Sequence, residues 1–342
     1  MQRRRRKRTA IGILLLIVTL LIASFLTWFY GSQTGSQLRE VLAEDCLSSQ
    51  HTYLASLLVG AARRKAIVQQ LLHSPTENSK PVVAMVAGGP IDKESQLIQE
   101  ATLHRSGYTA YILKIADPSA VHLAETKYRD KGEALRSILQ DTGALAGINA
   151  GAFQDPKGDG SGGTPIGTVF SFGRVVHSEA GRTLVSAILA DNSFVVGSYN
   201  TADLQAMRAR EAVHFYPELI VNGHPMITSG DGGWGYAPRT AMGATADGQI
   251  LFIVTNGRFI DGPWNVGASL RDVQNILLSY GAVNALNLDG GGSTTMMLDG
   301  KLMNHPETDT AAGMRYLPNA FIVVPKPGLV NNGPGQLLPS AP

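Results

Sequence analysis

The sequence is poor in cysteine and in charge. Its 342 residues include a single cysteine, Cys46, so the chain can form neither an internal disulfide nor a cysteine cluster for structural zinc. Neither H-E-x-x-H nor G-x-S-x-G occurs, which leaves a zincin helix and the nucleophile elbow of serine hydrolases without support. Charged residues make up 16%, against about 25% in ordinary globular domains. Much of the chain is therefore buried or faces lipid.

Basic residues are concentrated at the N-terminus. Six of them occupy positions 3–8 and together exceed the net charge of +2 of the whole chain. The remainder is net acidic and offers no basic face, so we expect no nucleic-acid partner.

Residues 9–30 contain no charge and are long enough to cross a ~30 Å hydrocarbon core as a helix. The basic residues before them and Trp28 at their far end predict a single-pass anchor in the cell membrane, with residues 1–8 as a cytoplasmic arm and the remainder extracellular. A cleavable signal peptide is the alternative, since it also begins with a basic segment. We favour the anchor because the apolar run exceeds the usual ~7–15 residues and no A-x-A site precedes Gly31.

Residues 31–80 read as a helical stalk and linker. Apolar residues recur at three- and four-residue steps over 36–73, which predicts one helix, and the polar segment 75–81 is bounded by prolines. The apolar stripe could pair with a second copy, giving a homo-oligomer, or pack on the globular part. Cys46 lies in this stalk, where it is either a buried thiol or half of an intermolecular disulfide.

Residues 81–325 change to short β-rich runs between glycine-rich turns, which predicts an α+β domain with a mixed or antiparallel sheet and few helices. The expected helices are 133–141 and 270–280, the second with Ser269 as N-cap and Gly281 as its stop. Residues 326–342 are rich in proline and glycine, and we predict a disordered tail. The expected strands are 82–86, 109–115, 168–172, 185–189, 241–245, 250–255, 285–288, 294–298 and 321–324.

The most informative segment is ALNLDGGGSTTM, residues 285–296. An apolar strand delivers Asn287 and Asp289 to its end, and Gly290, Gly291 and Gly292 then leave backbone N–H groups uncovered beside a carboxylate. This geometry suits an anion. A tight hairpin turn capped by Asp289 is the alternative. No spacing of residues requires a metal or cofactor; a divalent cation held by Asp289 and loop carbonyls is left open.

Further polar residues stand at the ends of other predicted strands. Asn149 follows one apolar run, Arg239 precedes another, and Arg258, Arg315 and Asn319 lie in similar places. In a domain with so few charges, arginines and asparagines beside glycines at strand ends indicate polar groups that converge on one site.

An ordered series of motifs resembles the phosphodiester glycosidase family over residues 108–324. The series is GINAGAF, VNGHPM, PRTAMG, VTNGR, GASLRD, ALNLDGGGSTTM, LMNHP and RYLPNAFIVV. The chain departs from many relatives where Asn149 is followed by Ala-Gly-Ala-Phe rather than Gly-Gly-Phe-Phe, and where Asn256 replaces an aspartate before Gly-Arg. The second change removes a carboxylate.

The resemblance implies an enzyme that hydrolyses a sugar 1-phosphodiester at the glycosidic C–O bond, with a phosphate monoester as the leaving group. Asp289 would then lie near the anomeric carbon as the catalytic carboxylate, and Arg239 and Arg258 would be catalytic residues that hold the phosphate. Asp231 and Asp261 are the candidates for a second carboxylate. The remaining substrate-binding candidates are the amides of Gly290, Gly291 and Gly292, together with Asn149, Asn287, Ser293 and Arg315.

We expect the substrate to belong to a cell-surface polysaccharide or glycan. A non-catalytic glycan-binding module with the same polar pocket is the alternative. A stalked structural protein, in which the glycine loops are only turns, is a third reading.

Overall fold

The computed structural model describes residues 2–47, 52–72, 76–83, 97–155, 161–307 and 310–324. The chain divides into two compact units, Met1–Val68 and Gln69–Pro342. The predicted tail and most of the predicted strand 82–86 lie outside the described residues, as does Pro75 of the predicted linker.

The N-terminal unit is helical and comprises α1 (Gln2–Gly31), α2 (Gln33–Leu47) and most of α3 (Thr52–Leu72). Within α1, the segment Ile11–Gly31 is long and apolar enough to span a membrane, and Phe29 is its one buried residue. The prediction of one helix over 36–73 is wrong, because α2 ends at Leu47 and α3 begins at Thr52. A second interruption follows from Gly60, whose φ of 79° is incompatible with α-helix geometry.

The globular unit is built from antiparallel sheets. A seven-stranded sheet has the order β1-β2-β14-β13-β15-β11-β12, and two five-stranded sheets have the orders β7-β6-β10-β8-β9 and β17-β16-β5-β19-β3. Strands β18 and β4 form a small fourth sheet. The strands are β1 Ile98–Arg105, β2 Tyr108–Ile115, β3 Val121–Glu125, β4 Glu133–Ala134, β5 Ala146–Asn149, β6 Val169–Ser171, β7 Arg174–His177, β8 Thr183–Leu189, β9 Phe194–Tyr199, β10 Ala209–His214, β11 Glu218–Val221, β12 His224–Pro225, β13 Thr240–Thr245, β14 Ile250–Thr255, β15 Ala282–Leu288, β16 Met296–Leu298, β17 Lys301–Leu302, β18 Tyr316–Leu317 and β19 Asn319–Val323.

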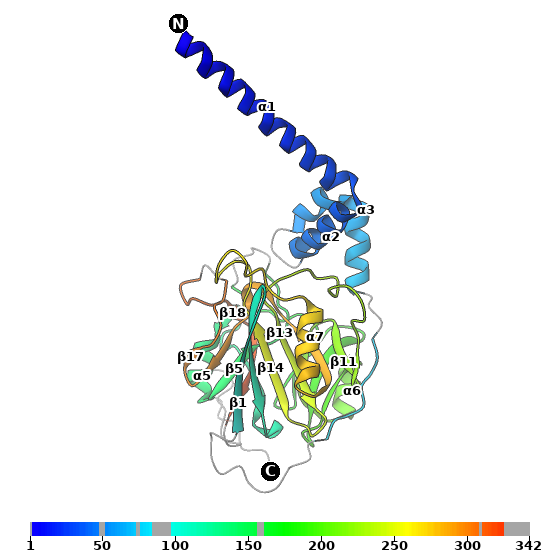
Figure 1. Cartoon of the computed structure of the whole chain (residues 1–342). Helices are drawn as coiled ribbons and strands as arrows, with labels where there is room; N and C mark the ends of the chain where they lie inside the picture. Colours follow the sequence, from blue (N-terminus) through cyan, green and yellow to red (C-terminus); the bar gives the residue numbers. More distant parts are fainter. Residues whose placement is uncertain are drawn as a thin grey trace. The chain divides into compact units, whose positions relative to one another are not determined.

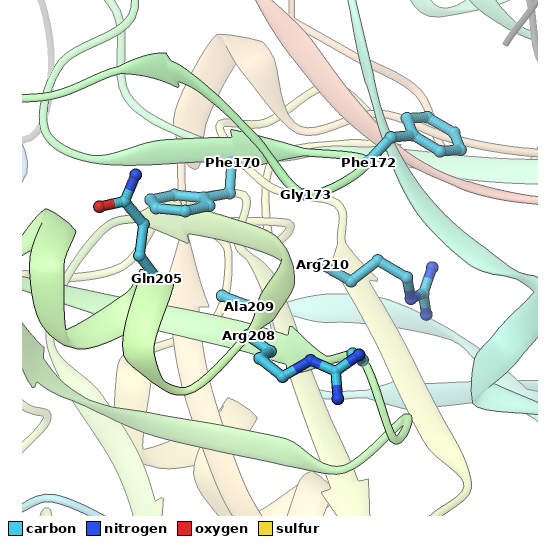
Figure 2. A pocket seen from close by; sticks show the side chains of 8 residues that line it. Phe170, Phe172, Gly173, Gln205, Arg208, Ala209 and Arg210 are labelled. Carbon is cyan, nitrogen blue, oxygen red and sulfur yellow. The ribbon is translucent and has the colours of Figure 1, made fainter. Parts of the chain in front are cut away.

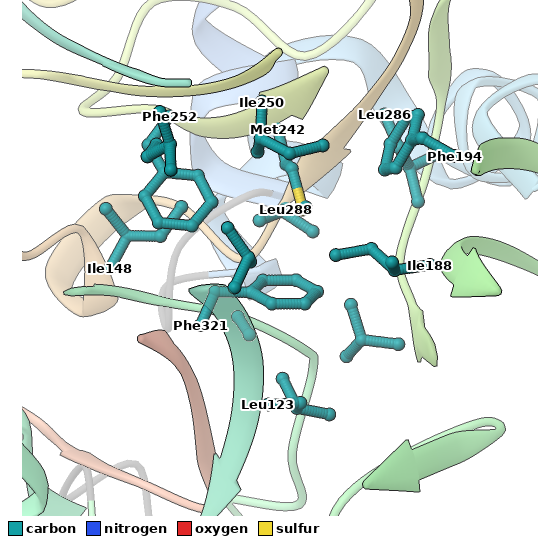
Figure 3. Packing of buried hydrophobic residues seen from close by; sticks show 14 of the residues in the cluster. Leu123, Ile148, Ile188, Phe194, Met242, Ile250, Phe252, Leu286, Leu288 and Phe321 are labelled. Atoms are coloured by element: carbon teal, nitrogen blue, oxygen red, sulfur yellow. The ribbon is translucent and has the colours of Figure 1, made fainter. Parts of the chain in front are cut away.

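The central strands are apolar throughout because both faces of their sheet are covered. In β14, Phe252 and Val254 enter the core that the large sheet shares with the two five-stranded sheets. Figure 3 shows Phe252 of this core close to Phe321 and Ile148. The alternate residues Leu251 and Ile253 point to the opposite face, where α7 packs. Burying each such side chain contributes about 1.5–3 kcal/mol to folding.

Three short helices cover outer faces of the sheets: α5 (Leu135–Thr142), α6 (Thr201–Ala206) and α7 (Leu270–Ser279), with 3-10 turns η1 (Pro118–Ala120) and η2 (Gly291–Ser293). Figure 1 shows α7 over the large sheet, where it packs against β15, β11 and β14. Helix α7 begins at the predicted cap, where Ser269 and Asp272 form a reciprocal capping box. The α+β class with antiparallel sheets is confirmed.

The polar segment before the globular unit is bound to it. Ser79 exchanges hydrogen bonds with Val196 in β9, and Lys80 donates its backbone N–H to Asn222 Oδ1 over 2.8 Å. The backbone N–H of Glu77 donates to Glu218 over 3.1 Å. Residues 77–81 of the predicted linker, together with Val82, thus form a strap that is bonded to β9 and β11 and to Asn222 after β11.

Candidate active site

The register of the large sheet brings three predicted motifs to one edge. Thr240, the first residue of β13, lies opposite Val254 of β14 on one side and Leu288 of β15 on the other. The adjoining residues Arg239, Thr255 and Asp289 therefore stand next to one another. Strand β5 reaches the same edge, because the Asp289 N–H donates to the carbonyl of Ala150 over 3.0 Å.

Each of the three glycines after Asp289 packs against a different arginine. A Cβ atom on Gly290 would lie 3.9 Å from Arg239 Cδ. On Gly291 it would lie 2.9 Å from Arg258 Nη2, and on Gly292 3.5 Å from Arg315 Nε. Gly291 also has φ +58°, a conformation that L side chains rarely adopt. A Cβ on Gly291 would displace Arg258, whereas on Gly290 and Gly292 it would clash with the carbonyls of Pro238 and Glu307, 2.9 and 2.8 Å away. The bare loop thus lets three arginines lie around it.

The Asp289 carboxyl has the most perturbed environment at this edge. Burial raises its pKa to about 6. The neighbouring Ser293 hydroxyl, the Arg315 charge and the Gly290 N–H oppose that rise, whereas the negative charge of Asp155 adds to it. A carboxylate that titrates near neutrality while facing arginines is suited to charge stabilisation, nucleophilic attack or proton transfer.

Arg315 lies between two carboxylates. Its Nη2 donates to Asp155 Oδ2 over 3.1 Å, its charge acts on Asp289, and its guanidinium lies 5.8 Å from the centre of the Phe153 ring. The sequence predicts Arg315 as a substrate-binding residue but misses Asp155. Asp155, rather than Asp231 or Asp261, is thus the second acidic side chain beside Asp289.

Arg258 is held from the opposite side of the loop. Its Nη1 donates to Glu307 Oε2 over 2.5 Å, and its backbone has φ 54°, an unusual conformation that tertiary contacts must impose. Its side chain is 23% exposed, so the guanidinium is accessible. Arg258 and Arg315, the latter 18% exposed, are thus partly accessible, whereas Arg239 is buried.

Arg239 is placed differently from the prediction. Its side chain is buried, with Nε donating to the Ala268 carbonyl over 3.1 Å and Nη2 donating to the carbonyls of Trp234 and Gly235. These bonds fasten the loop before β13. The Arg239 guanidinium is therefore fixed by carbonyls of the protein itself, and its contact with a phosphate stays a prediction.

The predicted asparagines form hydrogen bonds with other groups of the protein. Asn149 is completely buried; its Nδ2 donates to the Asp289 carbonyl over 2.6 Å and its Oδ1 accepts from Thr240 Oγ1 and Thr295 N. Asn287 is buried and donates to the Tyr216 carbonyl over 2.9 Å. Both amides are bonded within the protein, and Asn149 ties β5 to the glycine loop; contact of either amide with a substrate stays a prediction.

The glycine amides are partly used within the loop. The Gly291 N–H donates to the Pro238 carbonyl over 2.8 Å, and the Gly290 N–H bonds the Asp289 carboxyl. Binding of an anion by the glycine amides therefore stays a prediction. Ser293 is buried, and its hydroxyl lowers the pKa of the Asp289 carboxyl; its contact with a substrate stays a prediction as well.

Tyr216 is a site residue that the sequence does not reveal. It is half-buried, and its pKa is raised by burial and by the negative charge of Asp289, so its hydroxyl is near that carboxylate. Its ring packs against Trp234 at 5.2 Å between ring centres. Tyr216 precedes β11 and lies in none of the motifs that resemble the family, so the sequence gives no sign of its role.

The other predicted carboxylates have their own partners. Asp231 accepts from the Gly233 N–H over 2.8 Å, and Asp261 accepts from Asn256 and pairs with His305. Among the described residues, no group of three or more His, Cys, Asp or Glu side chains is arranged to hold a metal.

A hollow of about 420 Å³ lies elsewhere on the globular unit (Figure 2). It is bounded by Phe170, Phe172, Arg208 and Arg210 of the β6-β7 turn and the start of β10. Arg210 is engaged by His122 and Glu211. None of the residues around Asp289 lines this hollow, so we place the site at the glycine loop.

Fold and motif together define the class. Residues 142–324, just over half of the chain, match the family model for phosphodiester glycosidases, and the chain belongs to that family of hydrolases.

Individual relatives agree. The chain is 28% identical over 216 residues to the mouse N-acetylglucosamine-1-phosphodiester α-N-acetylglucosaminidase (55% of this chain, 39% of that protein). It is 38% identical over 86 residues to the human enzyme (25% of this chain, 16% of that protein) and 37% over 68 residues to the SPbeta prophage-derived protein YomE of Bacillus subtilis (20% and 10%). The chain thus spans less than two-fifths of the length of these relatives.

Among solved structures, the chain is similar to the catalytic domain of the zebrafish enzyme auto-inhibited by its pro-peptide. The TM-score is 0.60 at 19% identity, over 73% of this chain and 88% of that one. This likeness shows the fold.

Proposed function

We propose that this chain hydrolyses a sugar 1-phosphodiester at its glycosidic C–O bond, releasing the sugar and a phosphate monoester. The observation that carries the proposal is the loop in which Asp289, with a pKa near 6, stands beside two accessible arginines, Arg258 and Arg315. The names of the mammalian relatives point to a GlcNAc 1-phosphodiester as the first substrate to test.

The residues divide the chemistry between them. Arg258 and Arg315 would bind the phosphate oxygens and stabilise the charge that develops when the C–O bond breaks. Asp289, ionised, would stabilise or attack the oxocarbenium-like anomeric carbon. The buried Asn149 and Arg239 would hold the loop in place, so that Asp289 and the two arginines are already positioned when the substrate binds.

We further propose that Ile11–Gly31 anchors the chain in the cell membrane with its globular unit outside, acting on phosphate-linked sugars of a cell-surface polysaccharide. The length and apolar composition of this helix and the basic residues before it support this proposal.

The test uses the full chain in detergent, incubated with α-GlcNAc 1-phosphodiesters in water enriched in ¹⁸O. Cleavage of the glycosidic bond puts the label in the sugar, whereas cleavage of a P–O bond puts it in the phosphate. We expect labelled sugar, and a loss of about 10²–10⁴-fold in turnover for Asp289→Asn. Label in phosphate would contradict the assigned bond, and saturable binding without turnover would indicate a glycan-binding module.

A further inference from the structure

One motif of the family series, LMNHP, has no role in the site described so far, yet it runs beside the glycine loop. Asn304 bonds the loop from this segment, its Oδ1 accepting from the Met296 N–H over 2.8 Å and its Nδ2 donating to the Thr294 carbonyl over 2.9 Å. The Glu307 carbonyl lies only 2.8 Å from the position that a Cβ on Gly292 would occupy. His305, between them, therefore borders the catalytic loop.

The His305 imidazole belongs to a built arrangement rather than to a loose surface side chain. Its Nδ1 lies 2.5 Å from Asp261 Oδ1, and its backbone N–H donates to Asn256 Oδ1 over 3.1 Å. Asn256, which is buried, donates through Nδ2 to the other oxygen of Asp261. One buried amide thus fixes both the backbone of the histidine and its carboxylate partner.

This geometry leaves one ring nitrogen for chemistry. Because Nδ1 is tied to Asp261, proton exchange with a ligand falls to Nε2, and the His305 side chain is 66% exposed. Other charged or titratable groups around it are Arg258 and Glu307, which bind each other, and the Tyr111 hydroxyl, which accepts from Asn256. Only Pro306 separates His305 from Glu307, the partner of a proposed phosphate-binding arginine.

We propose that His305, oriented by Asp261, is a catalytic proton donor to the departing phosphate. This proposal rests on the proposed function. As water or Asp289 forms its bond to the anomeric carbon, the C–O bond breaks and its electron pair goes to the phosphate oxygen. That oxygen takes the Nε2 proton of the imidazolium, and the neutral imidazole is reprotonated from solvent. Asp261 stabilises the charged ring and fixes its tautomer, as the carboxylate does in a Ser-His-Asp triad.

The test compares two α-GlcNAc 1-phosphodiesters, one with a methyl and one with a p-nitrophenyl group as the second ester. The methyl phosphate is the more basic leaving group and gains more from protonation. In the full chain, we expect His305→Gln to lower kcat on the methyl diester by about 10²-fold and on the nitrophenyl diester by much less. In the pH profile of kcat, the decrease at alkaline pH should be absent from His305→Gln. Asp261→Asn should lower kcat with little change in KM.

His224→Gln is the matched control, because His224 is exposed on β12 and makes no contact with the loop among the described residues. Its turnover should equal that of the unaltered chain, and unchanged thermal unfolding of His305→Gln should show that its fold is intact. Equal losses on both diesters, or a His305→Gln variant that keeps its kcat and alkaline limb, would overturn the proton-donor role alone. An unaltered chain with no turnover would overturn the proposed function and this role together.

Discussion

Arg315 and Asp155 form an ion pair of 3.1 Å whose two charges act in opposite directions on Asp289. The guanidinium lowers the pKa of the Asp289 carboxyl and the Asp155 carboxylate raises it, while burial, the largest cause, brings it to about 6. The balance makes the ionisation of Asp289 adjustable by single substitutions that leave the residue itself in place.

We therefore predict opposite shifts of the acid limb of kcat/KM. If ionised Asp289 is the active form, activity falls as the pH drops through about 6. Arg315→Gln removes the charge that favours ionisation, so the limb should move to higher pH. Asp155→Asn removes the charge that opposes ionisation, so the limb should move to lower pH.

Arg174→Gln is the control for this pair, since Arg174 makes a similar ion pair of 3.2 Å with Glu125 away from the loop. Its pH profile should match that of the unaltered chain. Shifts of the same sign for Arg315→Gln and Asp155→Asn would show that Asp289 does not govern the limb.

The raised pKa also predicts that Asp289 lowers stability. A carboxyl that ionises less readily in the folded than in the unfolded state contributes most stability below pH ~4, and this contribution is lost as the pH rises through about 6. At pH 8, Asp289→Asn should therefore be more stable than the unaltered chain and unfold at a higher temperature. We expect its free energy of unfolding to rise by about 1–2 kcal/mol, because the half-buried site reduces the ~3 kcal/mol that corresponds to two pKa units.

The comparison is made by thermal unfolding at pH 8 and at pH 4, where the difference should vanish. Asp130→Asn, at an exposed position, controls for the loss of one negative charge. A destabilised Asp289→Asn at pH 8 would contradict the strained environment that burial implies.

Much of the strand pattern could be predicted from the sequence. The predicted strands 109–115, 241–245 and 250–255 correspond to β2, β13 and β14, because a strand covered on both faces reads as a continuous apolar run. The prediction missed β1, whose residues are mostly half-buried or exposed, and placed Glu133 and Ala134 in a helix although they form β4.

Part of the candidate site could likewise be predicted from the sequence, and part could not. The motifs identified the loop and its arginines, but whether an arginine faces a ligand depends on tertiary contacts. Arg239 and Arg258 have similar sequence settings, and only the carbonyls of Trp234, Gly235 and Ala268 make the first structural. Asp155 and Tyr216 approach Asp289 across long sequence separations, which no local pattern encodes.

The third prediction concerns the close approach of the glycine loop to Arg258. Gly291→Ala places a methyl carbon 2.9 Å from Arg258 Nη2, closer than van der Waals contact allows, so the flexible guanidinium should give way while the fold persists. We expect KM for a sugar 1-phosphodiester to rise about 10-fold or more, at about 1 kcal/mol of lost stability from the positive φ.

Gly300→Ala is matched to it in backbone strain, with φ +73°, but a Cβ there meets no atom within 4 Å. It should lose similar stability and keep its KM. If both alanine variants raise KM equally, the effect of Gly291→Ala comes from strain and not from Arg258.

The last prediction separates the two arginines that the sequence treats alike. Arg239→Lys retains the charge but has a single nitrogen, which cannot reach the carbonyls of Ala268, Trp234 and Gly235 together. Because these groups are buried and each hydrogen bond to a charged donor is worth about 1.5–3 kcal/mol, the variant should lose about 2 kcal/mol or more in denaturant unfolding of the globular unit. The Arg258 side chain is 23% exposed, so Arg258→Lys should change the free energy of unfolding little. Its KM for a charged diester should rise, because lysine lacks the planar fork of the guanidinium. For an uncharged aryl glycoside, the KM of Arg258→Lys should equal that of the unaltered chain. If Arg239→Lys instead raised KM with its stability intact, the buried guanidinium would have to reach the phosphate, and the division between the supporting and the ligand-binding arginine would be wrong.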